Sequence, residues 1–84
     1  MMRYFLLVYD RAAGELRELR EYDSAGANEA MADRFARERR YRADPNIEVV
    51  VIGSASRHAL RRTHGRYFSR STQGLVDDLA SLAG

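Results

Sequence analysis

The chain has 84 residues, a formal net charge of +2 and no cysteine, which predicts one domain spanning residues 1–84 without disulfide bonds. Two histidines and no cysteine argue against a structural zinc site. No apolar run approaches the ~20 residues that a membrane-spanning helix needs. We therefore expect a cytoplasmic protein with no membrane association, no metal and no cofactor.

The charges are unevenly distributed along the chain. All 14 basic residues are arginines. Residues 1–48 carry nine arginines and ten acids, whereas residues 49–76 carry five arginines and no acid, and residues 77–84 add two aspartates. The basic character is thus concentrated in one stretch of the C-terminal half, although a net charge of +2 by itself does not indicate nucleic acid.

Two stretches predict interior strands of a sheet. Five of the six residues in Ile47–Ile52 are β-branched, and such side chains favour a pleated surface. The stretch Tyr4–Tyr9 is largely apolar on both of its alternating faces. Gly14 then offers a turn toward the next element, because glycine adopts a positive φ without strain.

The stretch Glu15–Tyr22 is ambiguous between strand and helix. Leu16, Leu19 and Tyr22 recur at every third residue, which is closer to a helical period than to a strand. The stretch nevertheless follows a strand and a glycine turn, so we interpret it as a charged edge strand whose period is shifted by a β-bulge. A helix is the alternative.

Helices are predicted over residues 25–42, 55–64 and 72–83. Asp23 or Ser24 is the expected cap of the first helix, and Ser54 that of the second. Asp44-Pro45 ends the first helix, because proline disfavours a helical conformation in the residue before it. Residues 66–70 read as a short additional strand.

This order of elements predicts an α+β fold. We expect a two-layer sandwich with the order β-β-α-β-α-(short β)-α and a mainly antiparallel sheet. No family resemblance is evident, so the fold class carries no function with it.

The acid-free basic stretch is the strongest functional signal in the sequence. Guanidinium groups bind phosphates and carboxylates, and aromatic rings stack on bases. We therefore expect a small non-enzymatic binding module whose arginine face meets nucleic acid or an acidic protein. The alternative is a solvated cationic face neutralised by the chain's own acids, either Asp77 and Asp78 or the acids of residues 15–23. The candidate binding residues are Arg57, Arg61, Arg62, Arg66, Tyr67 and Arg70.

A second hypothesis is a structural homodimer or protein-interaction domain. If the last helix is too short to cover the second face of the sheet, then Tyr4, Leu6 and Val8 would form an exposed apolar surface. A second copy of the chain could cover that surface by two-fold symmetry.

A third hypothesis is an enzyme or a small-ligand binder that uses Arg34, Glu38, His64 and Tyr67. Arg34 and Glu38 are four residues apart on the inward side of the first predicted helix, and His64 ends the second. A pocket containing Arg34, Glu38 and His64 would need them to converge. No catalytic residue is assigned, because no motif for general acid–base or nucleophilic chemistry is present.

Overall fold

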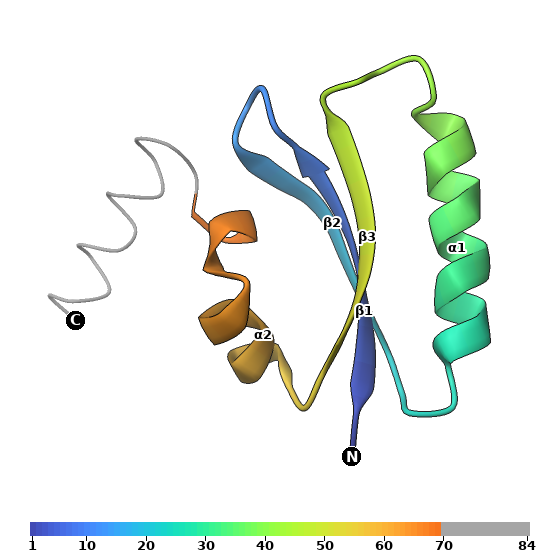
Figure 1. Cartoon of the computed structure of the whole chain (residues 1–84), viewed down its shortest axis with the longest axis vertical. Coiled ribbons are helices and arrows are strands. Elements are labelled where there is room, and N and C mark those ends of the chain that lie inside the picture. Colours follow the sequence, from blue (N-terminus) through green and yellow to red (C-terminus); the bar gives the residue numbers. More distant parts are fainter. Residues whose placement is uncertain (70–84) are drawn as a thin grey trace, which may run out of the picture.

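A computed structural model describes residues 1–69 of the chain, and it confirms the α+β class (Figure 1). The predicted helix over residues 72–83 and Arg70 lie outside the described residues. Within the described part, no helix has the length and apolar character needed to cross a membrane. The elements are β1 (Arg3–Asp10), β2 (Glu15–Tyr22), α1 (Ala27–Arg40), β3 (Ile47–Ser54), α2 (Arg57–Thr63) and the 3₁₀ helix η1 (Gly65–Tyr67).

The sheet has the strand order β2-β1-β3, and both pairings are antiparallel. The central strand is β1, in which the side chains from Phe5 to Val8 are fully buried. Among the described strands β3 pairs with β1 alone, so the prediction that Ile47–Ile52 is an interior strand is wrong. A β-branched run reports that the faces of a strand are covered, but it says nothing of a neighbour beside the strand.

Helices lie on both faces of the sheet, which gives three layers instead of the expected two (Figure 1). α1 packs on the face that carries Leu6 and Val51. Leu60 of α2 and Tyr67 of η1 pack on the opposite face, against Phe5 and its neighbours. The open sheet face that the homodimer hypothesis assumed is therefore occupied by helices in the described part of the chain.

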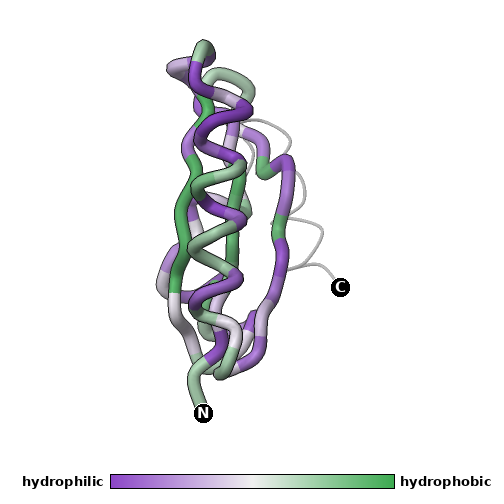
Figure 2. The backbone as a smooth tube through the Cα atoms, turned by 90° about the vertical axis from the view of Figure 1, so that its right-hand side faces the viewer, coloured by the Kyte–Doolittle hydropathy of each residue, from purple (hydrophilic) through white to green (hydrophobic). Residues whose placement is uncertain are grey.

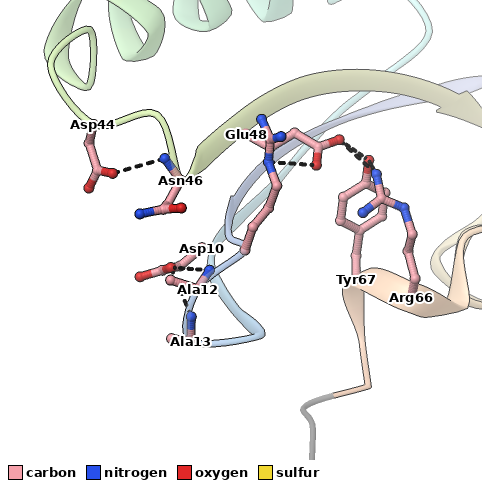
Figure 3. Close-up of polar contacts among 9 residues, drawn as sticks. Asp10, Ala12, Ala13, Asp44, Asn46, Glu48, Arg66 and Tyr67 are labelled. Atoms are coloured by element: carbon pink, nitrogen blue, oxygen red, sulfur yellow. Dashed lines mark hydrogen bonds and ion pairs between the residues drawn. The ribbon is translucent and has the colours of Figure 1, made fainter.

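The β1–β2 hairpin is held by Asp10 and a glycine. The Asp10 Oδ1 atom accepts hydrogen bonds from the backbone N–H groups of Ala12 and Ala13, both at 3.0 Å (Figure 3). Its Oδ2 atom accepts one from Nη2 of Arg17 at 2.6 Å. Gly14 then turns the chain with a φ of 64°, a conformation that glycine adopts readily.

The stretch from Glu15 to Tyr22 is a strand with a bulge, which confirms the prediction from the sequence. Val8 pairs with Glu18 but Tyr9 pairs with Leu16, so Arg17 is the extra residue. Because of this insertion, Leu16 and Leu19 pack on the same face of the sheet although they are an odd number of residues apart. The spacing that resembled a helix is therefore the spacing of a bulged strand.

α1 starts later than predicted and lacks a side-chain cap. Its N-cap is Gly26, and no side chain caps the first turn. A Cβ atom on Gly26 would lie 2.8 Å from Cβ of Tyr22, so any larger residue there would require the two elements to move apart. Asp23, one of the predicted caps, instead accepts a 2.9 Å hydrogen bond from the N–H of Ala25.

α2 is a short helix anchored by one buried side chain. Its cap is Ser56, not the predicted Ser54, and its Oγ accepts a 3.0 Å hydrogen bond from the N–H of Ala59. Leu60 is fully buried against the sheet. The strand predicted over residues 66–70 is wrong, because Gly65–Tyr67 form η1 and Tyr67 is buried.

Candidate functional site

The structure divides the predicted arginine surface into two parts. The first part lines a cavity of about 400 Å³ between β2 and α2. Arg66 and Tyr67 form the second part and contact Glu48 of β3 instead. The cavity is lined by Leu19, Arg57, His58, Arg61 and Phe68.

Arg57 is tied to the edge of the sheet through Glu21. Its Nε atom donates a 3.1 Å hydrogen bond to Oε1 of Glu21, while Oε2 of the same carboxylate lies 3.1 Å from Nη1 of Arg3. This contact uses only Nε of Arg57, whose side chain is still 62% exposed. Glu21 therefore positions Arg57 beside the cavity and leaves much of the guanidinium accessible.

Arg61 and Arg62 have no acidic partner within residues 1–69. The guanidinium carbon of Arg61 lies 5.0 Å from the centre of the Phe68 ring, a cation–π geometry. Arg62 is exposed on the next position of α2. Stacking on a ring leaves the hydrogen-bond donors of a guanidinium free at its edge, so Arg61 can still bind an anion.

Arg66 and Tyr67 belong to a polar cluster around Glu48 (Figure 3). Oε2 of Glu48 accepts a 2.6 Å hydrogen bond from the Tyr67 hydroxyl and a 2.8 Å bond from Nη2 of Arg66. Oε1 of Glu48 lies 3.6 Å from Nε of Arg11. The Arg66 guanidinium carbon also lies 4.1 Å from the centre of the Tyr67 ring. These contacts fasten η1 to β3, so Arg66 and Tyr67 have a structural role.

The contacts in this cluster shift two pKa values in opposite directions. Burial opposes ionisation of Glu48, but the hydrogen bonds from Tyr67 and Arg66 outweigh it and lower the pKa of Glu48 below its usual value. Burial, together with the same hydrogen bond to Glu48, raises the pKa of Tyr67 to about 12. Both pKa shifts favour the state in which the neutral Tyr67 phenol donates a hydrogen bond to the ionised Glu48 carboxylate.

The structure does not bring Arg34, Glu38 and His64 together. Arg34 and Glu38 form a 3.6 Å ion pair on α1, and Nε of Arg34 is buried without a hydrogen bond among the described residues. His64 ends α2, which packs on the opposite face of the sheet, and its Nδ1 lies 2.8 Å from Oγ1 of Thr63. The three residues therefore do not form one pocket.

Sequence reasoning missed several residues that matter for the site. Leu19, His58 and Phe68 line the cavity but were not among the candidate binding residues. Phe68 could have been found, because it lies within the basic stretch. Glu21 lies among the acids of residues 15–23 that were considered as neutralising groups, and it binds Arg57. Glu48 could not be found, because it binds an arginine 18 residues further along the chain, across a fold that the sequence pattern does not specify.

Two of the six predicted binding residues, Arg57 and Arg61, line the cavity. Arg62 is exposed beside them, and Arg70 lies outside the described residues.

Comparison of the chain with protein-family models, with curated proteins and with solved structures gave no match.

Proposed function

We propose that the chain is a small non-enzymatic binding module that holds an anionic group of a partner in the cavity between β2 and α2. The observation that carries the proposal is the lining of this cavity. Arg57, His58 and Arg61 converge there, and Arg61 has no acidic partner among residues 1–69. Guanidinium groups form paired hydrogen bonds with carboxylates and phosphates, and Leu19 and Phe68 supply an apolar wall beside them.

An acidic protein segment is the partner we favour over nucleic acid. A nucleic-acid backbone presents regularly repeated phosphates, and binding it tightly takes several cations along one track. Here Arg66 is bound to Glu48, and Arg57 shares Glu21 with Arg3. The remaining cations fit one or two carboxylates better than a run of phosphates.

The test compares two triple variants with equal charge changes. The first replaces Arg57, Arg61 and Arg62 with alanine. The second replaces Arg39, Arg40 and Arg42, which are exposed at the end of α1. Binding of a fluorescent acidic peptide that contains one aromatic residue is measured by anisotropy at about 50 mM salt.

We expect the peptide to bind the parent and the α1 variant but not the α2 variant, with circular dichroism unchanged in all three. A single-stranded RNA is titrated in parallel. Equal loss of peptide binding in both variants would mean that net charge alone determines binding, which would contradict a site at α2. Tighter binding of RNA than of the peptide would make nucleic acid the partner.

Homodimerisation is a second candidate role, and we propose it through a different surface from the one first considered. Both faces of the sheet carry helices, but the outer edge of β3 has no strand beside it among residues 1–69.

We also retain the cytoplasm as the proposed location, since the chain has no cysteine to form disulfides.

A further inference from the structure

The two edges of the sheet differ in a way that indicates a partner for one of them. Five of the eight residues of β2 are charged, whereas β3 carries a single charge, Glu48, near its start. In Figure 2, which looks onto α1, the left-hand strand is β3 and is coloured hydrophobic through its middle, while β2 on the right is largely hydrophilic. Charged residues protect an edge strand from pairing with other chains, and β3 lacks this protection.

The pairing with β1 determines which backbone groups of β3 face outward. The N–H of Arg11 bonds to the carbonyl of Asn46 at 2.8 Å, and these two residues continue the β1–β3 register. Backbone groups alternate along an antiparallel strand, so the even-numbered residues of β3 bond to β1. Val49, Val51 and Gly53 therefore direct their N–H and C=O groups away from β1, where no described residue bonds to them.

Two-fold symmetry restricts how this edge can pair with a second copy. A two-fold axis perpendicular to the sheet places one residue opposite its own counterpart. With Val51 at the axis, Val49 pairs with Gly53 of the other copy, and every outward-facing group of the three residues finds a partner. An axis at Val50 would instead need the N–H of Ile47, which already bonds to the carbonyl of Asp44 at 3.2 Å.

An exposed aromatic side chain lies beside the same edge. Phe35 is 53% exposed. Asp33 and Arg37 bond to β2, and at about 100° per residue Phe35 lies on the opposite flank of α1. Glu38 of that flank lines a cavity with Val49 and its neighbours. Phe35 precedes Glu38 by three residues, or about 4.5 Å along the helix. Because α1 and β3 run in opposite directions (Figure 1), Phe35 lies level with the middle of β3.

From these observations we infer that β3 pairs antiparallel with β3 of a second copy, with Val51 at the two-fold axis and the two Phe35 rings in contact across it. This interface deepens the homodimer role proposed above and makes one continuous sheet of the two copies. The open backbone groups and the exposed aromatic ring are independent features, and one symmetry operation satisfies both.

The oligomeric state is tested first, on the full chain. Sedimentation velocity over about a hundredfold range of concentration should give twice the 9.6 kDa chain mass at the upper end. A chain mass at all concentrations would overturn both the dimer role and the interface, including the case in which residues 70–84 of the same chain cover β3.

The interface is tested separately by two substitutions. Phe35→Glu and Val51→Pro should each weaken dimerisation by about tenfold or more, the first by bringing two charges together and the second by removing the N–H at the axis. Ala32→Glu, on the solvent side of α1, should leave the dimer intact. A dimer that tolerates both interface substitutions while circular dichroism stays unchanged would overturn this interface and retain the dimer role.

Cross-linking provides a readout that does not depend on weakening the dimer. The chain has no cysteine, so Phe35→Cys introduces a single reactive thiol. A short bis-maleimide should convert this variant to a covalent dimer. Arg40→Cys, on the opposite flank of α1, is the matched control and should remain uncoupled. Equal coupling of both variants, or of Arg40→Cys alone, would contradict pairing through β3.

Discussion

The hydroxyl of Tyr67 donates a 2.6 Å hydrogen bond to Oε2 of Glu48, and this bond joins η1 to the edge strand β3. Tyr67 is 5% exposed, and its ring meets the Tyr9 ring edge-on at 5.2 Å between centres. The pair therefore combines an apolar contact with the central strand and a polar contact with β3.

Tyr67→Phe should destabilise the fold by about 1–2 kcal/mol, because it removes the donor and leaves a partly buried carboxylate with one partner fewer. Urea unfolding followed by circular dichroism measures the change. Tyr41→Phe is the matched control, since no described residue bonds to the Tyr41 hydroxyl, and it should change the midpoint little. Equal midpoints for the two variants would contradict the role assigned to Glu48.

Two of the five tyrosines should ionise late on alkaline titration. Burial, with hydrogen bonds to Asp33 and Glu48 respectively, raises the pKa of Tyr22 and Tyr67 to about 12 from the usual 10.0. A raised pKa means that the folded chain holds the proton more tightly, so this stabilisation is complete below pH 10 and is lost as the pH rises toward 12. Tyrosinate absorbance should show two late equivalents that disappear in urea. Tyr22→Phe and Tyr67→Phe should each remove one.

The ion pair between Arg37 and Glu18 should contribute more than the pair between Arg34 and Glu38. Both Nε and Nη2 of Arg37 lie 2.9 Å from the Glu18 carboxylate, whereas Nε of Arg34 is 3.6 Å from Glu38. A double-mutant cycle with Arg37→Met and Glu18→Gln should give a coupling of about 1 kcal/mol. The same cycle at Arg34 and Glu38 should give a few tenths of a kcal/mol, about the value of an i, i+4 pair on a helix.

The Glu18 contact also predicts a pH dependence. The hydrogen bond from Arg37 lowers the pKa of Glu18 below its usual 4.5. Since the folded-state pKa is the lower one, the stabilisation is present above pH 4.5 and is lost as the pH falls through the folded value. Urea midpoints measured from neutral to acid pH should therefore fall less steeply in Glu18→Gln than in the parent. An unchanged slope would show that Glu18 does not contribute to acid unfolding.

Leu60→Ala should be the most damaging single change in α2. Leu60 is fully buried between α2 and the sheet, so its truncation should cost about 2–5 kcal/mol by leaving a cavity. Ser56→Ala, which removes only the cap of the same helix, should cost about 1 kcal/mol. Thermal unfolding of both variants measures the difference. A smaller loss for Leu60→Ala than for Ser56→Ala would mean that α2 is held by other contacts.

The sequence predicted which segments form strands and helices better than it predicted which strands lie side by side. The bulge at Arg17 was recoverable, because a glycine turn precedes a strand whose apolar residues change phase. The edge position of β3 was not, since hydrophobic patterns report which faces are covered and carry no record of strand order. η1 was also missed, because it depends on the bond between Tyr67 and Glu48, 19 residues apart.

The same limit applies to the candidate site. The basic stretch identified Arg57 and Arg61, which line the cavity. It also included Arg66, which is bound to Glu48. Charge counted along the chain cannot distinguish a free arginine from one neutralised by an acid on another element, and that distinction appears only when the strands are assembled.

The helices packed on the two faces of the sheet differ in length, and this has a consequence for partial unfolding. α1 has 14 residues and contacts all three strands, whereas α2 has seven residues, and the segment of α2 and η1 is held by two buried side chains, Leu60 and Tyr67. Cooperative segments with few buried contacts open at lower free energy than the rest of a domain. Residues 56–68 should thus detach as a unit while the hairpin and α1 stay folded, and amide hydrogen exchange should be faster in that segment than in the sheet or α1.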